Sequence, residues 1–168
     1  MELKGEAYFE VMSDPVNPFT VRSGKVVVSV LGTSFNMKKS TDSKEVEVFV
    51  TSGKVRMAID NSGQFITLES GDVGHTKREN LTKSIQKDSN YISWKTKDFK
   101  FVDAELLEVL KELEESYHVA IHPDMTESNE LKITNSYNEQ SIDAILETIG
   151  TAFGLTISHE VDGYHLTN

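Results

Sequence analysis

The sequence predicts a mixed fold: an all-β sandwich or barrel-like sheet domain over residues 1–90, then a small α+β domain with two strand–helix–strand repeats over residues 91–168. Short polar–apolar alternating segments separated by turn residues fill the first part. Apolar residues at three- and four-residue spacing, typical of helices, occur only in the second part. Charge divides in the same way. Residues 1–90 hold 12 Lys+Arg and 12 Asp+Glu, whereas residues 91–168 hold 5 and 15 and so carry the whole net charge of −10.

Length and composition limit the possible classes of protein. A chain of 168 residues suits one ordinary domain or two small ones. It has no cysteine, which excludes disulfides and thiolate metal sites. No apolar run approaches the roughly 18–20 residues that a membrane span needs, and Met1 does not open a signal peptide. The acidic balance opposes nucleic-acid binding, which requires a basic face.

In the first part, segments 45–50 and 54–57 alternate polar and apolar residues on either side of Thr51-Ser52-Gly53. This pattern predicts a β-hairpin, with the glycine supplying a positive φ. Val26-Val27-Val28 followed by Val30-Leu31 predicts a strand buried on both faces. The polar, lysine-rich segment 77–90 predicts a last strand and a linker, with the boundary at 88–90.

The second part begins with a predicted strand over residues 99–102, and Asp103 is the expected N-cap of the helix that follows. A second helix is expected to start after the cap residue Ser141 and to stop at Gly154. The apolar faces of the two helices are Leu106, Leu107, Leu110, Leu113 and Tyr117, and Ile142, Ile145, Leu146, Ile149 and Phe153.

Strands are expected at 119–121, 131–133, 155–157 and 164–166, the last two around an Asp162-Gly163 turn. The order strand, capped helix, returning strand therefore occurs twice, from Phe101 to Ile121 and from Ile133 to Ile157. Two such units sharing one small sheet predict an α+β sandwich.

Three sequence blocks near the start of the chain are specific in residue identity and spacing, yet contain no catalytic or metal-binding residues. They are Leu3-x-Gly5-Glu6-Ala7-Tyr8-Phe9-Glu10-Val11, Pro18-Phe19-x-Val21 and Val28-x-Val30-Leu31-Gly32-Thr33-x-Phe35-Asn36. They resemble the periplasmic sensor domain of FecR-family transmembrane anti-sigma factors. The second part, with Phe99-x-Phe101, the leucine helix and Phe153-Gly154, resembles the secretin/TonB short N-terminal-like domain that follows it in the family.

The resemblance implies a relay through protein–protein contacts. A TonB-dependent outer-membrane transporter would present its periplasmic signalling domain to the sensor. The sensor would pass the state to an extracytoplasmic-function (ECF) sigma factor through a cytoplasmic domain outside this sequence, so controlling transcription. The full-length protein is expected in the inner membrane with a single span, and this region in the periplasm. Because the family's sensor domain begins upstream of Gly5, we expect an N-terminally truncated domain with an exposed strand edge near Gly5–Val11.

Partner binding is expected in the second domain, by strand edges that pair with a like fold. The candidate edges are residues 131–134 and the terminal strand 164–167. The candidate contact residues are Leu131, Lys132, Ile133, Thr134, Tyr164, His165 and Leu166.

No catalytic, cofactor-binding or metal site is expected. His118, His122 and Asp124 have a loose metal-ligand spacing, but a strand end and loop explain them better. His159 and His165 can face each other across the last hairpin, where surface positions again explain them better. No pair of carboxylates, nucleophile elbow or phosphate loop stands out. The alternative to a sensor is a carbohydrate-binding β domain with an appended interaction module, and an enzyme is the weakest hypothesis.

Overall fold

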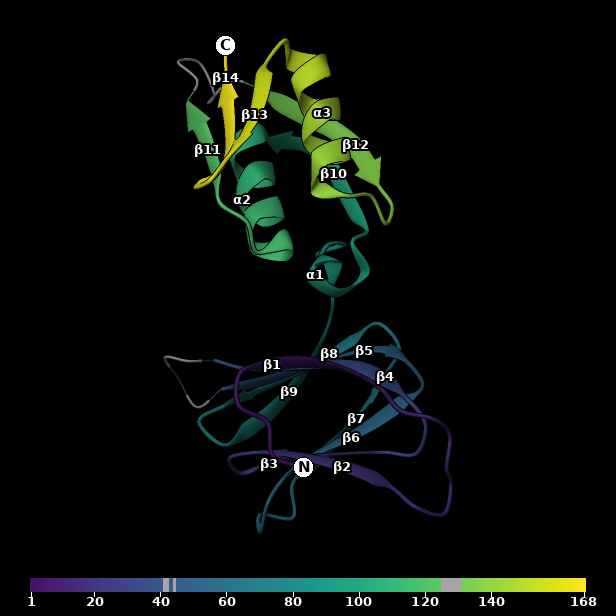
Figure 1. Ribbon diagram of the computed structural model, residues 1–168. Helices are drawn as coiled ribbons and strands as arrows, with labels where there is room; N and C mark the ends of the chain where they lie inside the picture. The colour runs from purple at the N-terminus through teal and green to yellow at the C-terminus, as the bar shows by residue number, and fades with distance from the viewer. Residues whose placement is uncertain (41–42, 44, 125–130) are drawn as a thin grey trace. The chain divides into compact units, whose positions relative to one another are not determined.

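The computed structural model describes residues 1–40, 43, 45–124 and 131–168 and divides the chain into two units, Met1–Lys87 and Asp88–Asn168 (Figure 1). The first unit is built from strands, and the second combines strands with helices. This is the mixed, β-rich fold that the sequence predicts.

Within its described residues, the first unit is a sandwich of two antiparallel sheets. One sheet has the strand order β1-β4-β5-β8-β9, and the other has the order β2-β3-β6-β7 (Figure 1). The strands are β1 Glu6–Glu10, β2 Phe19–Ser23, β3 Val26–Val30, β4 Ser34–Lys39, β5 Val46–Ser52, β6 Lys54–Ile59, β7 Phe65–Glu69, β8 Asp72–Lys77 and β9 Asn80–Ile85.

The sandwich core follows from the period-two alternation of these strands. Alternate residues of β4 and β5 point between the sheets and meet the inner face of β3, β6 and β7. The fully enclosed side chains include Phe35, Met37, Val48, Val50, Val55, Met57 and Leu68. The expectation that β3 is buried on both faces is wrong, because Val26, Val28 and Val30 are buried while Val27 and Ser29 are only half-buried.

The predicted hairpin of residues 45–57 is also wrong. β5 and β6 are both present, but β5 pairs with β4 and β8, whereas β6 pairs with β3 and β7. At Gly53 the chain therefore crosses from one sheet to the other. Gly53 has φ +80°, and a Cβ there would lie 2.7 Å from the carbonyl oxygen of Gly32. The glycine signal correctly marked a turn, but the turn joins facing sheets.

The expected strand edge near Gly5–Val11 is confirmed. In the described part of the chain, β1 pairs with β4 alone and forms one edge of the five-stranded sheet. Glu6 near its start is paired with Lys38, whose Nζ lies 3.0 Å from the glutamate Oε2. Tyr8 is linked to β5 through a 2.7 Å hydrogen bond between its hydroxyl and Thr51 Oγ1.

The second unit contains two strand–helix–strand repeats followed by a last strand. The elements are α1 Ser93–Thr96, β10 Phe99–Glu105, α2 Leu106–Tyr117, β11 Ile121–Asp124, β12 Lys132–Tyr137, α3 Ile142–Phe153, β13 Thr156–Glu160 and β14 Gly163–Thr167. None of the described helices is both long and apolar enough to cross a membrane.

The repeats do not share one sheet as expected. Their first strands, β10 and β12, pair with each other antiparallel, and their returning strands, β11 and β13, lie on either side of β14. Both sheets contribute to one core with the two helices, which includes Phe101, Leu113, Ile133, Leu146 and Leu166.

The two main helices begin differently. Ser141 caps α3 as predicted, accepting a 3.3 Å hydrogen bond from the amide of Ala144, and Gly154 ends this helix with φ +67°. Asp103 is not the N-cap of α2, because Glu105 holds that position. Asp103 instead lies in an irregular part of β10 with φ +51°, and its carboxylate accepts a 2.9 Å hydrogen bond from Lys132 Nζ.

Candidate functional site

The predicted contact residues lie on two separate sheets of the second unit. Lys132, Ile133 and Thr134 form the first half of β12, and the carbonyl of Leu131 accepts a 2.8 Å hydrogen bond from the amide of Leu106. In the described part of the chain β12 pairs with β10 only, so its other side is a strand edge. Ile133 is buried in the core, whereas Lys132 and Thr134 are exposed.

The pairing of β12 with β10 determines which backbone N–H and C=O groups of β12 point away from the sheet. The amide of Lys100 donates to Asn90 Oδ1 and so faces away from β12, and its partner across the ladder is Ser136. The backbone of Ser136 therefore also faces outward. Because successive residues of a strand alternate in this respect, the outward-facing backbone groups of the predicted segment belong to Lys132 and Thr134.

The expected edge at the terminal strand is wrong. β14 is the central strand of its sheet, parallel to β11 on one side and antiparallel to β13 on the other. Tyr164 and Leu166 are buried in the core, and the Tyr164 hydroxyl donates a 2.9 Å hydrogen bond to Asp143 Oδ1 of α3. Strand β11 covers the side of β14 that was expected to be an open edge, because it returns from α2 alongside the end of the chain.

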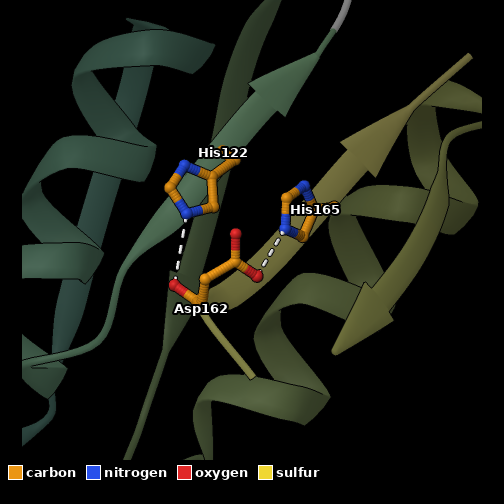
Figure 2. Close-up of side chains that lie close together, drawn as sticks. All are labelled: His122, Asp162 and His165. Carbon is orange, nitrogen blue, oxygen red and sulfur yellow. Dashed lines mark hydrogen bonds and ion pairs between the residues drawn. The ribbon is translucent and has the colours of Figure 1, made fainter. Parts of the chain in front are cut away.

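His165 points to the opposite face of this sheet from Tyr164 and Leu166, since neighbouring strand residues alternate. Its parallel-strand partner is His122 of β11, and the two imidazole rings lie 4.7 Å apart between centroids. Asp162, in the turn before β14, completes a group of three polar side chains on this outer face (Figure 2).

Hydrogen bonds orient both rings. His165 Nδ1 lies 3.1 Å from Asp124 Oδ2, and its Nε2 lies 3.1 Å from Asp162 Oδ1. His122 Nε2 lies 3.2 Å from the backbone oxygen of Asp162 (Figure 2). The hydrogen bonds to Asp162 and Asp124 raise the pKa of His165 above its usual 6.5, and the bond from His165 lowers the pKa of Asp162 below 3.8.

This grouping differs from the pairs that the sequence suggested. His118 ends α2 in the left-handed conformation, and His159 stacks on Tyr164 at 4.2 Å instead of facing His165. The grouping of His122 with His165 depends on a parallel pairing across 43 positions, which no local spacing reveals. The alternation of the last hairpin could have placed only Asp162 and His165 together.

Two family models match the chain, one in each unit. The model described as FecR protein matches residues 2–56, and the model described as FecR, C-terminal, matches residues 98–166. No curated protein matches the sequence.

Two solved structures resemble the chain over its whole length. Both are crystal structures of a candidate anti-sigma factor from Parabacteroides distasonis ATCC 8503. The sequence identities are 25% and 26%, and both TM-scores are 0.55. The similarity covers 99% and 98% of this chain and 78% of each of the other chains.

Proposed function

The chain belongs to the FecR family of anti-sigma factors, and on that premise we propose that it is the periplasmic sensor region of a membrane-anchored anti-sigma regulator. Its role is to bind other proteins, with no catalysis of its own. The observation that carries this proposal is the match of a FecR model in the first unit and a FecR C-terminal model in the second.

The partner proposed for this region is the signalling domain of a TonB-dependent outer-membrane transporter. The regulator relays the loading of the transporter with substrate to an ECF sigma factor, which its cytoplasmic domain holds on the other side of the inner membrane. Within the region, residues 1–90 are the FecR-like sensor domain. Residues 91–168 are the signalling domain, similar to the secretin/TonB short N-terminal domain, and receive the partner.

The proposed contact is the open edge of β12, at residues 131–134. The outward backbone groups of Lys132 and Thr134 are available to a strand of the partner, which would extend the β10–β12 sheet by β-augmentation. Main-chain hydrogen bonds supply affinity in this mode. The surplus of acidic residues in 91–168 adds long-range attraction for a partner with a basic face.

Thr134→Pro tests this edge. Proline removes the outward amide, and an edge strand tolerates it where that amide faces away from the sheet. The measurement is titration calorimetry of the 168-residue chain with the purified signalling domain of a TonB-dependent transporter from the same organism. We expect at least a tenfold loss of affinity, because one main-chain hydrogen bond and close approach of the partner strand are both lost.

The matched control is Thr134→Val, which lacks the hydroxyl that accepts from the Asp103 amide but keeps the outward amide. Its affinity is expected to stay within about twofold of the unmodified chain. Equal binding by the proline variant would remove the β12 edge as the contact. Absence of binding by the unmodified chain would instead count against the transporter as partner.

A further inference from the structure

The outer face of the β11-β14-β13 sheet carries a set of side chains suited to a metal ion. His122, Asp162 and His165 each offer one ligand atom, and these atoms lie within 4.8 Å of one another. They come from β11, from the turn before β14 and from β14 itself (Figure 2). The site lies wholly in the second unit.

The backbone holds these positions before any ion binds. His122 and His165 are direct partners in a parallel strand pair, so their Cα atoms are fixed by the ladder. Asp162 sits in the short turn between β13 and β14, whose ends are closed by the pairing of Glu160 with Gly163. Three ligands on a paired sheet and a tight turn lose little conformational freedom when they converge.

Asp124 lies behind His165 and orients its imidazole ring. Its Oδ2 lies 3.1 Å from His165 Nδ1, the arrangement in which a carboxylate fixes the tautomer and orientation of a metal-binding histidine. The other ring nitrogen, Nε2, is then directed at Asp162 and is the ligand atom.

We propose that this cluster binds Zn²⁺ through His122, Asp162 and His165, with water in the fourth position. Imidazole nitrogen and carboxylate oxygen are ligands that zinc takes at about 2.0–2.2 Å, so tetrahedral ligand atoms lie roughly 3.3 Å apart. His165 Nε2 and Asp162 Oδ1 are already 3.1 Å apart. The other ligand atoms are within 4.8 Å of one another, and adjustment of the exposed Asp162 and half-buried His122 side chains brings them to tetrahedral spacing.

The chemistry of the ligands narrows the choice of ion. Two imidazoles disfavour Mg²⁺ and Ca²⁺, which take oxygen ligands. The surrounding charge favours a cation, because Asp124 and Glu160 lie near His165 and residues 91–168 carry the net charge of −10.

The experiment is calorimetric titration of the 168-residue chain with ZnCl₂ at pH 8 in a non-chelating buffer, with the same titration using MgCl₂. We expect saturable one-to-one binding of Zn²⁺, no saturable binding of Mg²⁺, and perturbed imidazole signals of His122 and His165 by NMR. His122→Ala and Asp162→Asn are each expected to weaken Zn²⁺ binding at least tenfold. Asp124→Asn is expected to weaken it about tenfold through loss of the supporting carboxylate.

The matched control is His159→Gln, which removes a histidine of the same hairpin that lies against Tyr164 and outside the cluster. Its zinc affinity is expected to be unchanged. Thermal unfolding verifies that each variant is folded, and Asp162→Asn, in an exposed turn, is the variant least able to disturb the core. Absence of saturable Zn²⁺ binding, or equal weakening by His159→Gln and His122→Ala, would overturn the proposal.

Discussion

Among single residues, Asp72 shows how a turn of the first unit is held. It is the first residue of β8, after the turn from β7, and it is only 9% exposed to solvent. Its Oδ2 accepts hydrogen bonds of 2.6 Å from the amide of Glu69 and of 2.6 Å from Lys83 Nζ. The bond from Lys83, then that from Glu69, holds the pKa of Asp72 below its usual 3.8. The ionised carboxylate therefore stabilises the folded state.

Asp72→Ala is expected to reduce the free energy of unfolding of the first unit by about 1–2 kcal/mol at neutral pH, as both hydrogen bonds to the charge are lost. Because the pKa is lower in the folded state, this contribution is complete above the unfolded pKa of about 3.8 and disappears as pH falls through the folded value. Urea unfolding of both proteins between pH 7 and pH 2 measures the difference. Asp72→Asn, which keeps an acceptor for the Glu69 amide, should be intermediate. A difference that stays constant down to pH 2 would contradict this account.

At the scale of elements, local signals located helices and strands well, because each signal is satisfied within its own segment. Ser141 accepts from Ala144 three residues later, and Gly154 adopts the left-handed conformation that ends α3. Asp103 had the same chemistry as a cap, but its carboxylate binds Lys132 on the neighbouring strand. A tertiary partner thus overrides a local preference.

Pairing between elements could not be predicted in the same way. The polar–apolar alternation of β5 and β6 indicates that each strand has one buried face, and Gly53 indicates that the chain turns between them. Whether the two strands pair or face each other depends on which neighbours cover those faces. The His122–His165 contact has the same origin, since it requires the parallel register of β11 and β14. The spacing of residues along the chain reveals neither the sheet to which β5 and β6 belong nor the pairing of β11 with β14.

The close approach of the two sheets in the first unit depends on Gly74 of β8. A Cβ at this position would lie 2.7 Å from both Leu68 Cδ1 and Met57 Sδ. Gly74→Ala is therefore expected to cost about 1–3 kcal/mol by overpacking, measured by urea unfolding with far-UV circular dichroism.

Introducing Gly74→Ala into a Leu68→Ala variant distinguishes overpacking of the side chains from an effect on the backbone. With Leu68→Ala already present, the contact with Leu68 Cδ1 is gone and only that with Met57 Sδ remains, so Gly74→Ala should cost less than it does alone. Strictly additive effects of the two substitutions would show that contact with Leu68 is not the cause.

For the whole molecule, the main organising fact is that each unit has its own core. The buried cluster of the first unit includes Val48 and Met57, the cluster of the second includes Leu113 and Leu146, and the two clusters share no residue. The single tryptophan, Trp94, belongs to the second unit. Its fluorescence therefore reports on one unit, whereas far-UV circular dichroism reports on both.

This division predicts separate unfolding of the two units. Leu146→Ala removes a fully buried side chain of the second core and is expected to lower the stability seen by Trp94 fluorescence by about 2–5 kcal/mol. Met57→Ala, an equally buried truncation in the first core, should leave the fluorescence transition unchanged while shifting part of the circular dichroism transition. If Met57→Ala shifts the fluorescence midpoint as far as Leu146→Ala does, the units unfold as one cooperative body. Separate transitions would mean that a partner can stabilise the second unit without stabilising the first.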